Sequence, residues 1–425
     1  MTKRHYLLTL LLAAAAQAPL ATAAFAQSDP AALEARLAAQ DEVIRQLQAR
    51  LDQLEKQPAA AVAAAPAAAP VSLDTPTAKI RGRLQIDALA FNDSDRSNPT
   101  GTQVRRFYLG AEGKFGNGFR YQAEVDFAGN KSVIQDALIA WQATPRLELV
   151  AGYFKPAVTS DDMTSDVQTV FLERSAYAGV FAPGRRVGVG ANYAGDGWGL
   201  RGGVFGEKDG STLDGDRDEA WLVSLRGSAD LLPGDDVLHV ALESYYVSPS
   251  NTDGAVQHSQ KPETNRALTA IDTGTFKADR GTFGGAELAY AHGPFTVQVE
   301  GGVLRYDGPV VSPGFTGWSG QASWRLTGEK RPYDAKAGTF GRITPAHSIS
   351  DGGPGAIEAA LRLTQVDLTD DLINGGKLST YGLVLNWIPV TKLRISGNLI
   401  QAHTERVGFD DVDETLVTVR TALDW

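Results

Sequence analysis

The sequence predicts an all-β protein: a sixteen-stranded antiparallel transmembrane β-barrel preceded by a short coiled-coil helix. Three observations predict this fold. Beyond residue 78, short segments repeatedly alternate apolar and polar side chains, which is typical of strands with one apolar face. After the N-terminal region, no stretch approaches the roughly 18 consecutive apolar residues of a spanning helix. The chain also ends in an alternating segment whose last residue, Trp425, is aromatic.

The C-terminal segment, residues 415–425 (TLVTVRTALDW), is the most informative of these. Val417 and Val419 fall on one face of a strand, while Arg420 and Asp424 fall on the other. In a membrane barrel the apolar face would meet lipid, the polar face would line the lumen and the terminal aromatic would join the interfacial girdle. An edge strand of a soluble sheet shows the same alternation, so this segment alone leaves both interpretations open.

Residues 1–26 predict a secretory signal peptide. Lys3 and Arg4 precede a short apolar core, and residues 24–26 (AFA) form a small-residue cleavage site. The mature chain is therefore expected to begin near Gln27. The absence of cysteine suits an exported protein in an oxidising compartment.

Residues 27–56 predict a periplasmic coiled coil. Its apolar seam advances by alternate steps of four and three residues, with one polar member, through Leu33, Leu37, Gln40, Ile44, Leu47, Leu51 and Leu54. Arg50 and Glu55 are placed for an interhelical pair and resemble a pattern of trimeric coiled coils. A single amphipathic helix lying on another surface is the alternative, although such helices usually have a wider apolar stripe.

Residues 57–78 form an Ala/Pro-rich linker, and the predicted barrel occupies residues 79–425. Sixteen segments of the barrel fit strands, an even number as bacterial single-chain barrels have. The predicted strands are 79–91, 103–115, 118–128, 132–142, 146–154, 185–194, 197–206, 219–229, 236–247, 281–291, 294–305, 317–329, 355–367, 378–388, 391–403 and 414–425.

The lengths of the connections test this strand count. If the chain enters from the periplasm, the even-numbered connections should be short turns. All even-numbered connections are short except 328–354. Either the strand count is wrong at this point, or this segment folds back into the barrel. The long odd-numbered connections are 155–184 and 248–280. Sixteen strands leave an aqueous channel that only inward-folded segments can narrow.

Alternation assigns ten arginines to the lumen: Arg81, Arg83, Arg106, Arg120, Arg201, Arg226, Arg325, Arg362, Arg394 and Arg420. Lysine is scarce on these faces, with Lys114 as the exception. A planar guanidinium group binds two oxygens of a phosphate or carboxylate at once, which favours an anion path. Alternatively, these arginines pair with the inward acids Asp87, Glu112, Glu124, Asp126, Asp136, Glu300 and Glu358. The sequence leaves both interpretations open because selectivity depends on the net sign and spacing of the charges.

Seven groups of residues occur in a characteristic order: RRF at 105–107, YQAEVDF at 121–127, GYFKP at 152–156, TS at 164–165 with FLERS at 171–175, FGRITP at 340–345, GAIE at 355–358 with VDL at 366–368, and LVLNW at 383–387. With them the chain resembles the phosphate-selective porin family, the porins O and P, over residues 79–425. The resemblance implies a trimeric sixteen-stranded barrel with an arginine ladder. It also implies two extracellular loops and one periplasmic segment folded into the lumen, which would account for the three long connections.

One position departs from the family pattern. The resemblance implies a lysine two residues before the Thr-Ser pair that ends at Ser165, where this chain has Asp162. Arg174 in the same loop and Arg342 in the periplasmic segment match the family. We therefore expect this loop to form a constriction with Arg174 and the inward arginines on one side, and on or near the other side Asp161, Asp162 and Asp166. Opposed charges would create a transverse field with only a mild anion preference.

The sequence thus predicts an outer-membrane porin for small polar solutes, with phosphate or other anions as candidate permeants. The expected partners are these permeants, outer-membrane lipid and further copies of the chain in a homotrimer. The alternative is a structural barrel with a restricted lumen that tethers the envelope through its coiled coil. No catalytic constellation, metal-ligand spacing or cofactor motif is present in the sequence, so no enzyme, metal or cofactor is predicted. The formal net charge of −10 argues against a nucleic-acid partner.

Overall fold

The computed structural model describes residues 75–93, 98–206, 220–232, 234–249 and 254–425, together with Arg45 and Ala49, which are helical. The chain divides into two units, Met1–Val71 and Ser72–Trp425, and the second contains the sheet. The predicted signal peptide, nearly all of the predicted coiled coil and most of the linker lie outside the described residues, so these assignments stay predictions. No helix among the described residues has the length and hydropathy of a membrane span.

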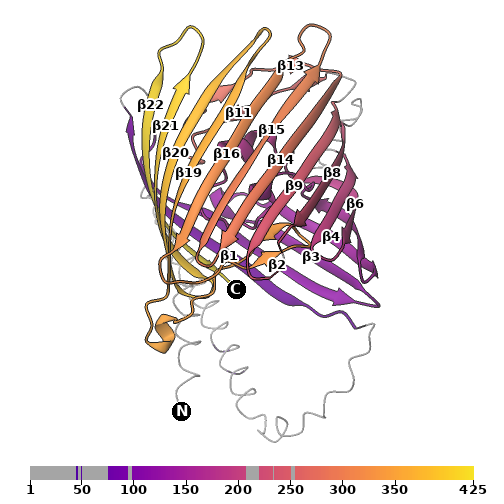
Figure 1. Ribbon diagram of the computed structural model, residues 1–425, viewed down its shortest axis with the longest axis vertical. Helices are drawn as coiled ribbons and strands as arrows, with labels where there is room; N and C mark the ends of the chain where they lie inside the picture. Colours follow the sequence, from indigo (N-terminus) through magenta and orange to yellow (C-terminus); the bar gives the residue numbers. More distant parts are fainter. Residues whose placement is uncertain are drawn as a thin grey trace, which may run out of the picture. The chain divides into compact units, whose positions relative to one another are not determined.

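Sixteen antiparallel strands of the described residues close into one barrel, in which the first strand pairs with the last (Figure 1). In order around the barrel they are β1 (Lys79–Asp93), β2 (Gly101–Phe115), β3 (Phe119–Asp126), β4 (Val133–Thr144), β5 (Leu147–Phe154), β6 (Arg186–Ala194), β7 (Trp198–Phe205), β8 (Trp221–Asp230), β9 (Val237–Ser248), β14 (Arg280–His292), β15 (Phe295–Asp307), β16 (Gly314–Arg325), β19 (Ala356–Asp370), β20 (Ile373–Val390), β21 (Leu393–Glu405) and β22 (Val412–Asp424).

All sixteen predicted strands are present, and the prediction of a sixteen-stranded antiparallel barrel is confirmed. The boundaries differ most at β20, which begins at Ile373 rather than at residue 378. Its first residues pair with β19 beyond a register shift between Asp367 and Thr369. Gly375 and Gly376 lie in this part of β20 and interrupt the apolar alternation, which is why the sequence pattern did not extend so far.

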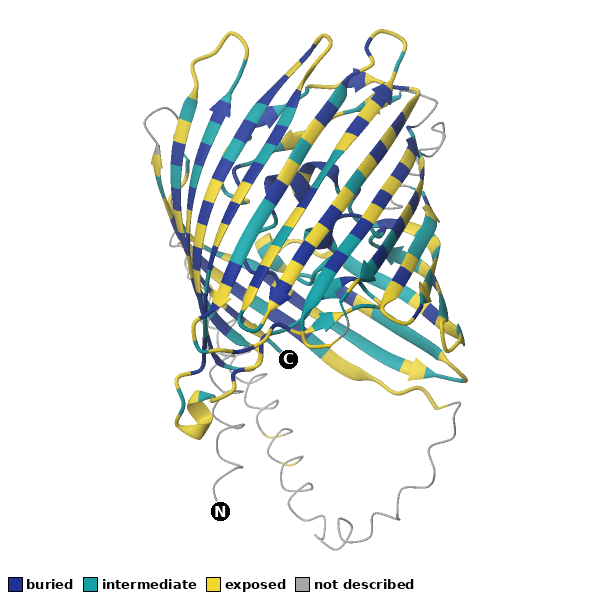
Figure 2. Ribbon diagram, viewed as in Figure 1, coloured by how far each residue is buried: buried dark blue, intermediate teal, exposed yellow. Residues whose placement is uncertain are grey.

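The closed sheet sorts the side chains of each strand onto two walls. Exposed and buried residues alternate along the strands, as the bands in Figure 2 show. The outer wall carries exposed apolar side chains such as Ile139, Val189 and Leu383, while the inner wall is largely polar. This is the arrangement expected of a barrel that faces lipid outside and water inside.

The rim at which β1 begins and β22 ends is here named the terminal rim. Five of the seven tryptophans lie on strands next to it or at its edge, and all five are exposed: Trp141, Trp198, Trp324, Trp387 and Trp425. Amphipathic aromatic rings at this height form the interfacial girdle expected of a membrane barrel.

Three long connections fold into the barrel. The inner loop, residues 155–185, contains α3 (Ser160–Met163) and α4 (Ala176–Phe181). The second inner segment, residues 254–279, contains the short strand pairs β10 (Ala255–Val256) with β13 (Phe276–Lys277), and β11 (Ser259–Gln260) with β12 (Ile271–Asp272). The insert, residues 326–355, contains β17 (Tyr333–Asp334), β18 (Thr339–Phe340) and the 3₁₀ turn η3 (Ile349–Asp351). A further 3₁₀ turn, η2 (Ala128–Asn130), lies between β3 and β4.

The insert explains the one long even-numbered connection: the segment folds back into the barrel, and the strand count does not slip there. Arg226 of β8 donates hydrogen bonds to the carbonyls of Ala337 and Gly338 in the insert. Arg331 of the insert donates to the carbonyl of Gln168 in the inner loop. The insert therefore contacts both the barrel wall and the inner loop.

An aromatic cluster fixes the inner loop to the wall. Phe181 of α4 stacks on Phe283 of β14 at 5.9 Å between ring centroids, and Phe283 stacks on Tyr245 of β9 at 4.9 Å. Tyr177 packs against Phe181 one turn away, and all four side chains are buried. Burial of such large rings stabilises the helix against one side of the lumen.

The last residue closes the barrel. The Trp425 amide donates to the carbonyl of Gly82 at 3.1 Å, and the Gly82 amide donates to the carbonyl of Trp425 at 3.3 Å. A Cβ atom on Gly82 would lie 2.0 Å from the Trp425 ring, so only glycine lets the indole cover the backbone of β1.

We predict that Trp425→Ala lowers the yield of folded barrel and destabilises it by about 1–3 kcal/mol, because the indole cover over Gly82 is lost. Heat-modifiable migration on a gel and urea unfolding measure this. Trp221→Ala, which removes an exposed tryptophan next to the opposite rim, is the matched control. Equal yields of folded Trp425→Ala and wild-type protein would contradict the prediction.

Candidate pore constriction and its charge network

All ten arginines that alternation assigned to the lumen lie on inward-facing positions. Eight of them form ion pairs: Arg81 with Glu112 and Glu124, Arg83 and Arg106 with Asp166, Arg120 with Glu148, Arg226 with Glu287, Arg325 with Glu358, Arg362 with Glu263, and Arg420 with Asp87 and Glu173. Among the described residues, Arg201 and Arg394 are the inward arginines without an ion pair. Most of the arginines are therefore compensated by carboxylates.

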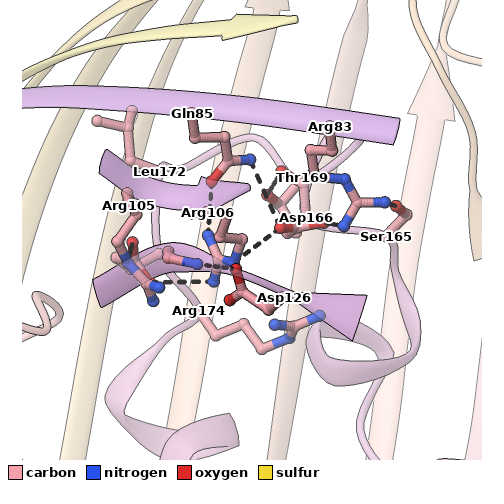
Figure 3. A network of polar contacts seen from close by, with 12 residues as sticks. Arg83, Gln85, Arg105, Arg106, Asp126, Ser165, Asp166, Thr169, Leu172 and Arg174 are labelled. Carbon is pink, nitrogen blue, oxygen red and sulfur yellow. Dashed lines mark hydrogen bonds and ion pairs between the residues drawn. The ribbon is translucent and has the colours of Figure 1, made fainter. Parts of the chain in front are cut away.

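Two acids of the inner loop hold it against the wall near the barrel seam. Asp166 forms ion pairs with Arg83 and, at 2.9 Å, with Arg106, as Figure 3 shows. Glu173 forms ion pairs of 2.7 Å with Arg105 and 2.6 Å with Arg420. These arginines come from β1, β2 and β22, so the loop is fixed to strands on both sides of the seam between the first and last strands.

The charges of these two acids are stabilised by their surroundings. Burial alone raises the pKa of both carboxyl groups. The field of Arg106, supported by Arg83 at Asp166 and by Arg105 at Glu173, outweighs burial and holds both pKa values well below their usual range. Both groups are therefore ionised across the physiological range, and their arginines are not free to bind a permeant anion.

Asp162 lies beside the cations that it was expected to oppose. Its carboxylate accepts from Lys155 Nζ at 2.6 Å and pairs with Arg174 Nε at 2.9 Å. Burial raises the pKa of Asp162, but Lys155 and Arg174 lower it by more. The expectation that Arg174 and Asp162 face each other across the constriction is wrong. The loop doubles back between them, so the two charges neutralise each other on the same loop.

The neighbouring acid and hydroxyl of this loop are also engaged. The Asp161 carboxylate accepts from the Ser175 amide at 2.7 Å. The hydroxyl of Ser165 accepts from Arg83 at 3.5 Å, and its carbonyl accepts from the amide of Thr169 at 3.0 Å. These contacts organise the turn of the inner loop rather than forming the expected negative side of a transverse field.

The remaining candidate arginines connect the inner segments to the wall. Arg342 of the insert donates two hydrogen bonds, of 2.9 and 2.6 Å, to Asp424 of β22. Arg362 pairs with Glu263 of the second inner segment and lies over the Phe171 ring at 4.2 Å. Both arginines hold an inner segment in place.

The accessible part of the lumen lies along β2 to β7. Side chains there remain partly exposed: 39% for Arg120 and 38% for Glu112. On β16 and β22, Arg325 and Arg420 are 0% and 1% exposed because the inner segments cover them. The inner segments therefore fill one side of the barrel and leave a path along the other.

Several charged residues of this network escaped the sequence analysis. Lys155 and Glu173 lie in two of the quoted motifs, GYFKP and FLERS, but were assigned no role. Glu287 follows the strand alternation and was missed among the inward acids. Glu263 and Arg331 lie in long connections, where no periodic pattern predicts which way a side chain points. Among the described residues no group of His, Cys, Asp and Glu is arranged to hold a metal ion.

A family model described as phosphate-selective porin O and P matches residues 78–425. The chain belongs to this porin family. The resemblance drawn from the motifs is thus confirmed, and the protein is an outer-membrane channel for small solutes rather than an enzyme.

Individual relatives of this porin are distant. An uncharacterised protein of Caulobacter vibrioides is 29% identical over 337 residues, covering 75% of this chain and 67% of the relative. Porin O of Pseudomonas aeruginosa is 24% identical over 385 residues, covering 79% and 86%. The solved structure of OmpT, an outer membrane protein of Vibrio cholerae in its trimer form, superposes with a TM-score of 0.52 at 13% identity, covering 83% of this chain and 100% of OmpT.

We predict that Asp162→Asn makes this porin more selective for anions, because the isosteric change leaves Lys155 and Arg174 uncompensated. One charge about 5 Å from a permeant ion changes its energy by about 1–3 kcal/mol before screening, enough to shift a permeability ratio several-fold. Reversal potentials in planar bilayers measure this. Asp235→Asn, at an exposed turn of the terminal rim, is the control. An unchanged reversal potential would place Asp162 away from the permeation path.

We also predict that anion preference falls as the pH rises from 7 to 9. Burial, together with Arg174 and Arg185, lowers the pKa of Lys155 to about 8 even though Asp162 opposes the shift. Lys155 is therefore protonated below pH 8 and loses its charge above it. Reversal potentials as a function of pH give the midpoint. The Lys155→Arg variant keeps its positive charge over this pH range, so its reversal potential should not change with pH. If the reversal potential of this variant changes with pH as in wild type, Lys155 is not the titrating group.

Proposed function

We propose that this porin conducts small polar solutes with a mild preference for anions. The observation that supports this proposal is the alternation of charge along the accessible side of the lumen. Positive and negative groups there form neighbouring pairs: Arg81 with Glu112, Arg120 with Glu148, and Arg185 with Asp136. A wall with both signs admits neutral and zwitterionic solutes and discriminates weakly between ions.

Arg201 supports a preference for anions over cations. It lies opposite Asn192 on one neighbouring strand and Arg226 on the other. The Arg226 charge is compensated by Glu287, and Asn192 donates to Glu148 at 3.0 Å. Arg201 is half-buried, and its Nε has no hydrogen-bond partner among the described residues. Within the part of the chain that the structure describes, Arg201 has no ion pair, and nearby Glu148 and Asp334 compensate its charge only in part. One incompletely compensated guanidinium group beside the path favours anions modestly.

Phosphate is proposed as one permeant among other small anions, without a strong site. A strong phosphate path would need several adjacent guanidinium groups with free donors. Here the candidate binding arginines, including Arg83, Arg106 and Arg362, form ion pairs with carboxylates. Each would have to break such a pair before binding phosphate.

We further propose a homotrimer in the outer membrane, with the terminal rim in the periplasm. Family membership, the predicted coiled coil over residues 27–56 and the trimer form of OmpT support this assembly. The coiled coil would add to contacts between barrels, since a seam this short is marginal alone. A monomeric mass of the full chain by light scattering in mild detergent would contradict the trimer.

A barrel that only tethers the envelope is the second candidate. The observation that favours it is the burial of wall residues under three inner segments, which restricts the lumen. The partly exposed side chains along β2 to β7 favour conduction instead.

Reversal potential under a salt gradient tests the proposed function. We predict that wild type is anion-preferring by about two- to five-fold, the size that one incompletely compensated charge supplies after screening. Arg201→Gln should bring the ratio close to one. Arg146→Gln, a change of the same charge at an exposed turn, should leave it unchanged.

Three results would contradict this proposal. A wild-type channel that prefers cations would refute the proposed anion preference. Strong block of the chloride current by dilute phosphate would indicate a phosphate site instead. A folded barrel without measurable conductance would favour the tethering function.

A further inference from the structure

A small cavity lies near the terminal rim, where three parts of the protein meet. Gln168 of the inner loop and Arg331 and Arg342 of the insert line one side, and Lys392 and Arg394 at the start of β21 line another. Its volume is about 20 Å³. That is room for one water molecule or one ion of similar size.

Positive groups outnumber negative groups around this cavity. Four cations line it: Arg331, Arg342, Lys392 and Arg394. Two carboxylates, Glu358 and Asp424, also line it. The excess of positive charge is larger than these four cations and two carboxylates suggest. Glu358 is shared between Arg331 and a further cation, Arg325, at 3.5 and 3.9 Å.

The carboxylates are already engaged. Asp424 accepts both hydrogen bonds of Arg342, and Glu358 also accepts from the amide of Asn386 at 3.0 Å. Among the described residues, neither Arg394 nor Lys392 has an ion-pair partner. Arg394 is buried while Lys392 is exposed. A buried positive charge without a counter-charge is costly, so Arg394 in particular favours an additional anion in the cavity.

Arg394 supplies the most specific evidence. It is 8% exposed, and its buried Nε has no hydrogen-bond partner. Its other nitrogens donate to backbone carbonyls of the inner loop, at 2.6 Å to Thr169 and 3.4 Å to Asp166. Arg394 therefore brings a buried guanidinium charge with incompletely satisfied donors to the lining of the cavity.

We propose that this cavity binds one small inorganic anion of the size of chloride. The site is distinct from the path along β2 to β7. The bound anion compensates Arg331 of the insert and Arg394, which holds the inner loop through Thr169. Occupancy therefore fixes the two segments that narrow the lumen relative to each other and to β21.

Thermal unfolding of the full chain in detergent tests this site. Sodium chloride is titrated against sodium gluconate at constant ionic strength, because gluconate is too large for the cavity. Saturating chloride should raise the unfolding midpoint of wild type by about 3–5 °C. In Lys392→Gln and Arg394→Gln the apparent dissociation constant for chloride should rise at least about five-fold, since each variant removes a charge next to the ion.

Two variants are used so that the test can be decided with one even if the other misfolds. Arg394→Gln also loses hydrogen bonds to the inner loop, whereas the Lys392 side chain is exposed and has no ion pair among the described residues. Lys114→Gln removes an exposed lysine elsewhere near the terminal rim and should respond to chloride like wild type. The proposal is overturned if chloride does not stabilise wild type, or if Lys392→Gln responds to chloride as wild type does.

A crystal grown with bromide in place of chloride provides the direct readout. The expected result is an anomalous peak in the cavity between Arg331 and Arg394. Crystals in which this cavity carries no anomalous peak would overturn the proposal independently of the thermal measurements.

Discussion

Asp166 and Glu173 of the inner loop lie inside the barrel against arginines of β1, β2 and β22. Taking these charges out of water costs several kcal/mol per ion, and close pairing with several hydrogen bonds offsets that cost. The loop cannot leave the wall without leaving buried guanidinium groups unpaired. The position of the loop, and therefore the shape of the channel, depends on these pairs.

The same pairs limit what the arginines can do for permeation. A guanidinium group that holds a carboxylate at 2.6–2.9 Å has few donors left for a passing anion. The inner wall near the seam is thus rich in arginine but nearly neutral. We therefore propose that selectivity rests with the few cations whose compensation is incomplete, above all Arg201 on the open side.

The three inner segments are held by the same means. Each has at least one charge that pairs with the wall: the buried Asp166 in the inner loop, the buried Glu263 in the second inner segment and the half-buried Arg342 in the insert. Apolar packing supplements the charges: Phe181 of α4 stacks on Phe283, and Phe276 of the second inner segment packs edge-on against Tyr306. Non-helical backbone at membrane depth is tolerated here because it is buried in protein or lines a water-filled lumen.

Local pattern by itself determined the sixteen strands and the inward position of the ten arginines, because the side-chain period of a strand is two and one wall must be apolar. Order and spacing of motifs also predicted the family, and that was confirmed. The coiled coil over residues 27–56 is predicted by the same kind of pattern and stays a prediction.

Only the tertiary structure decided which arginines form ion pairs and which do not. Arg420 and its partner Asp87 lie 333 positions apart, and Asp162 pairs with Arg174 because the inner loop doubles back. Alternation tells which wall a strand residue faces, but the charge that it meets lies on another strand or on a loop without a period, and only the closed barrel brings the two together.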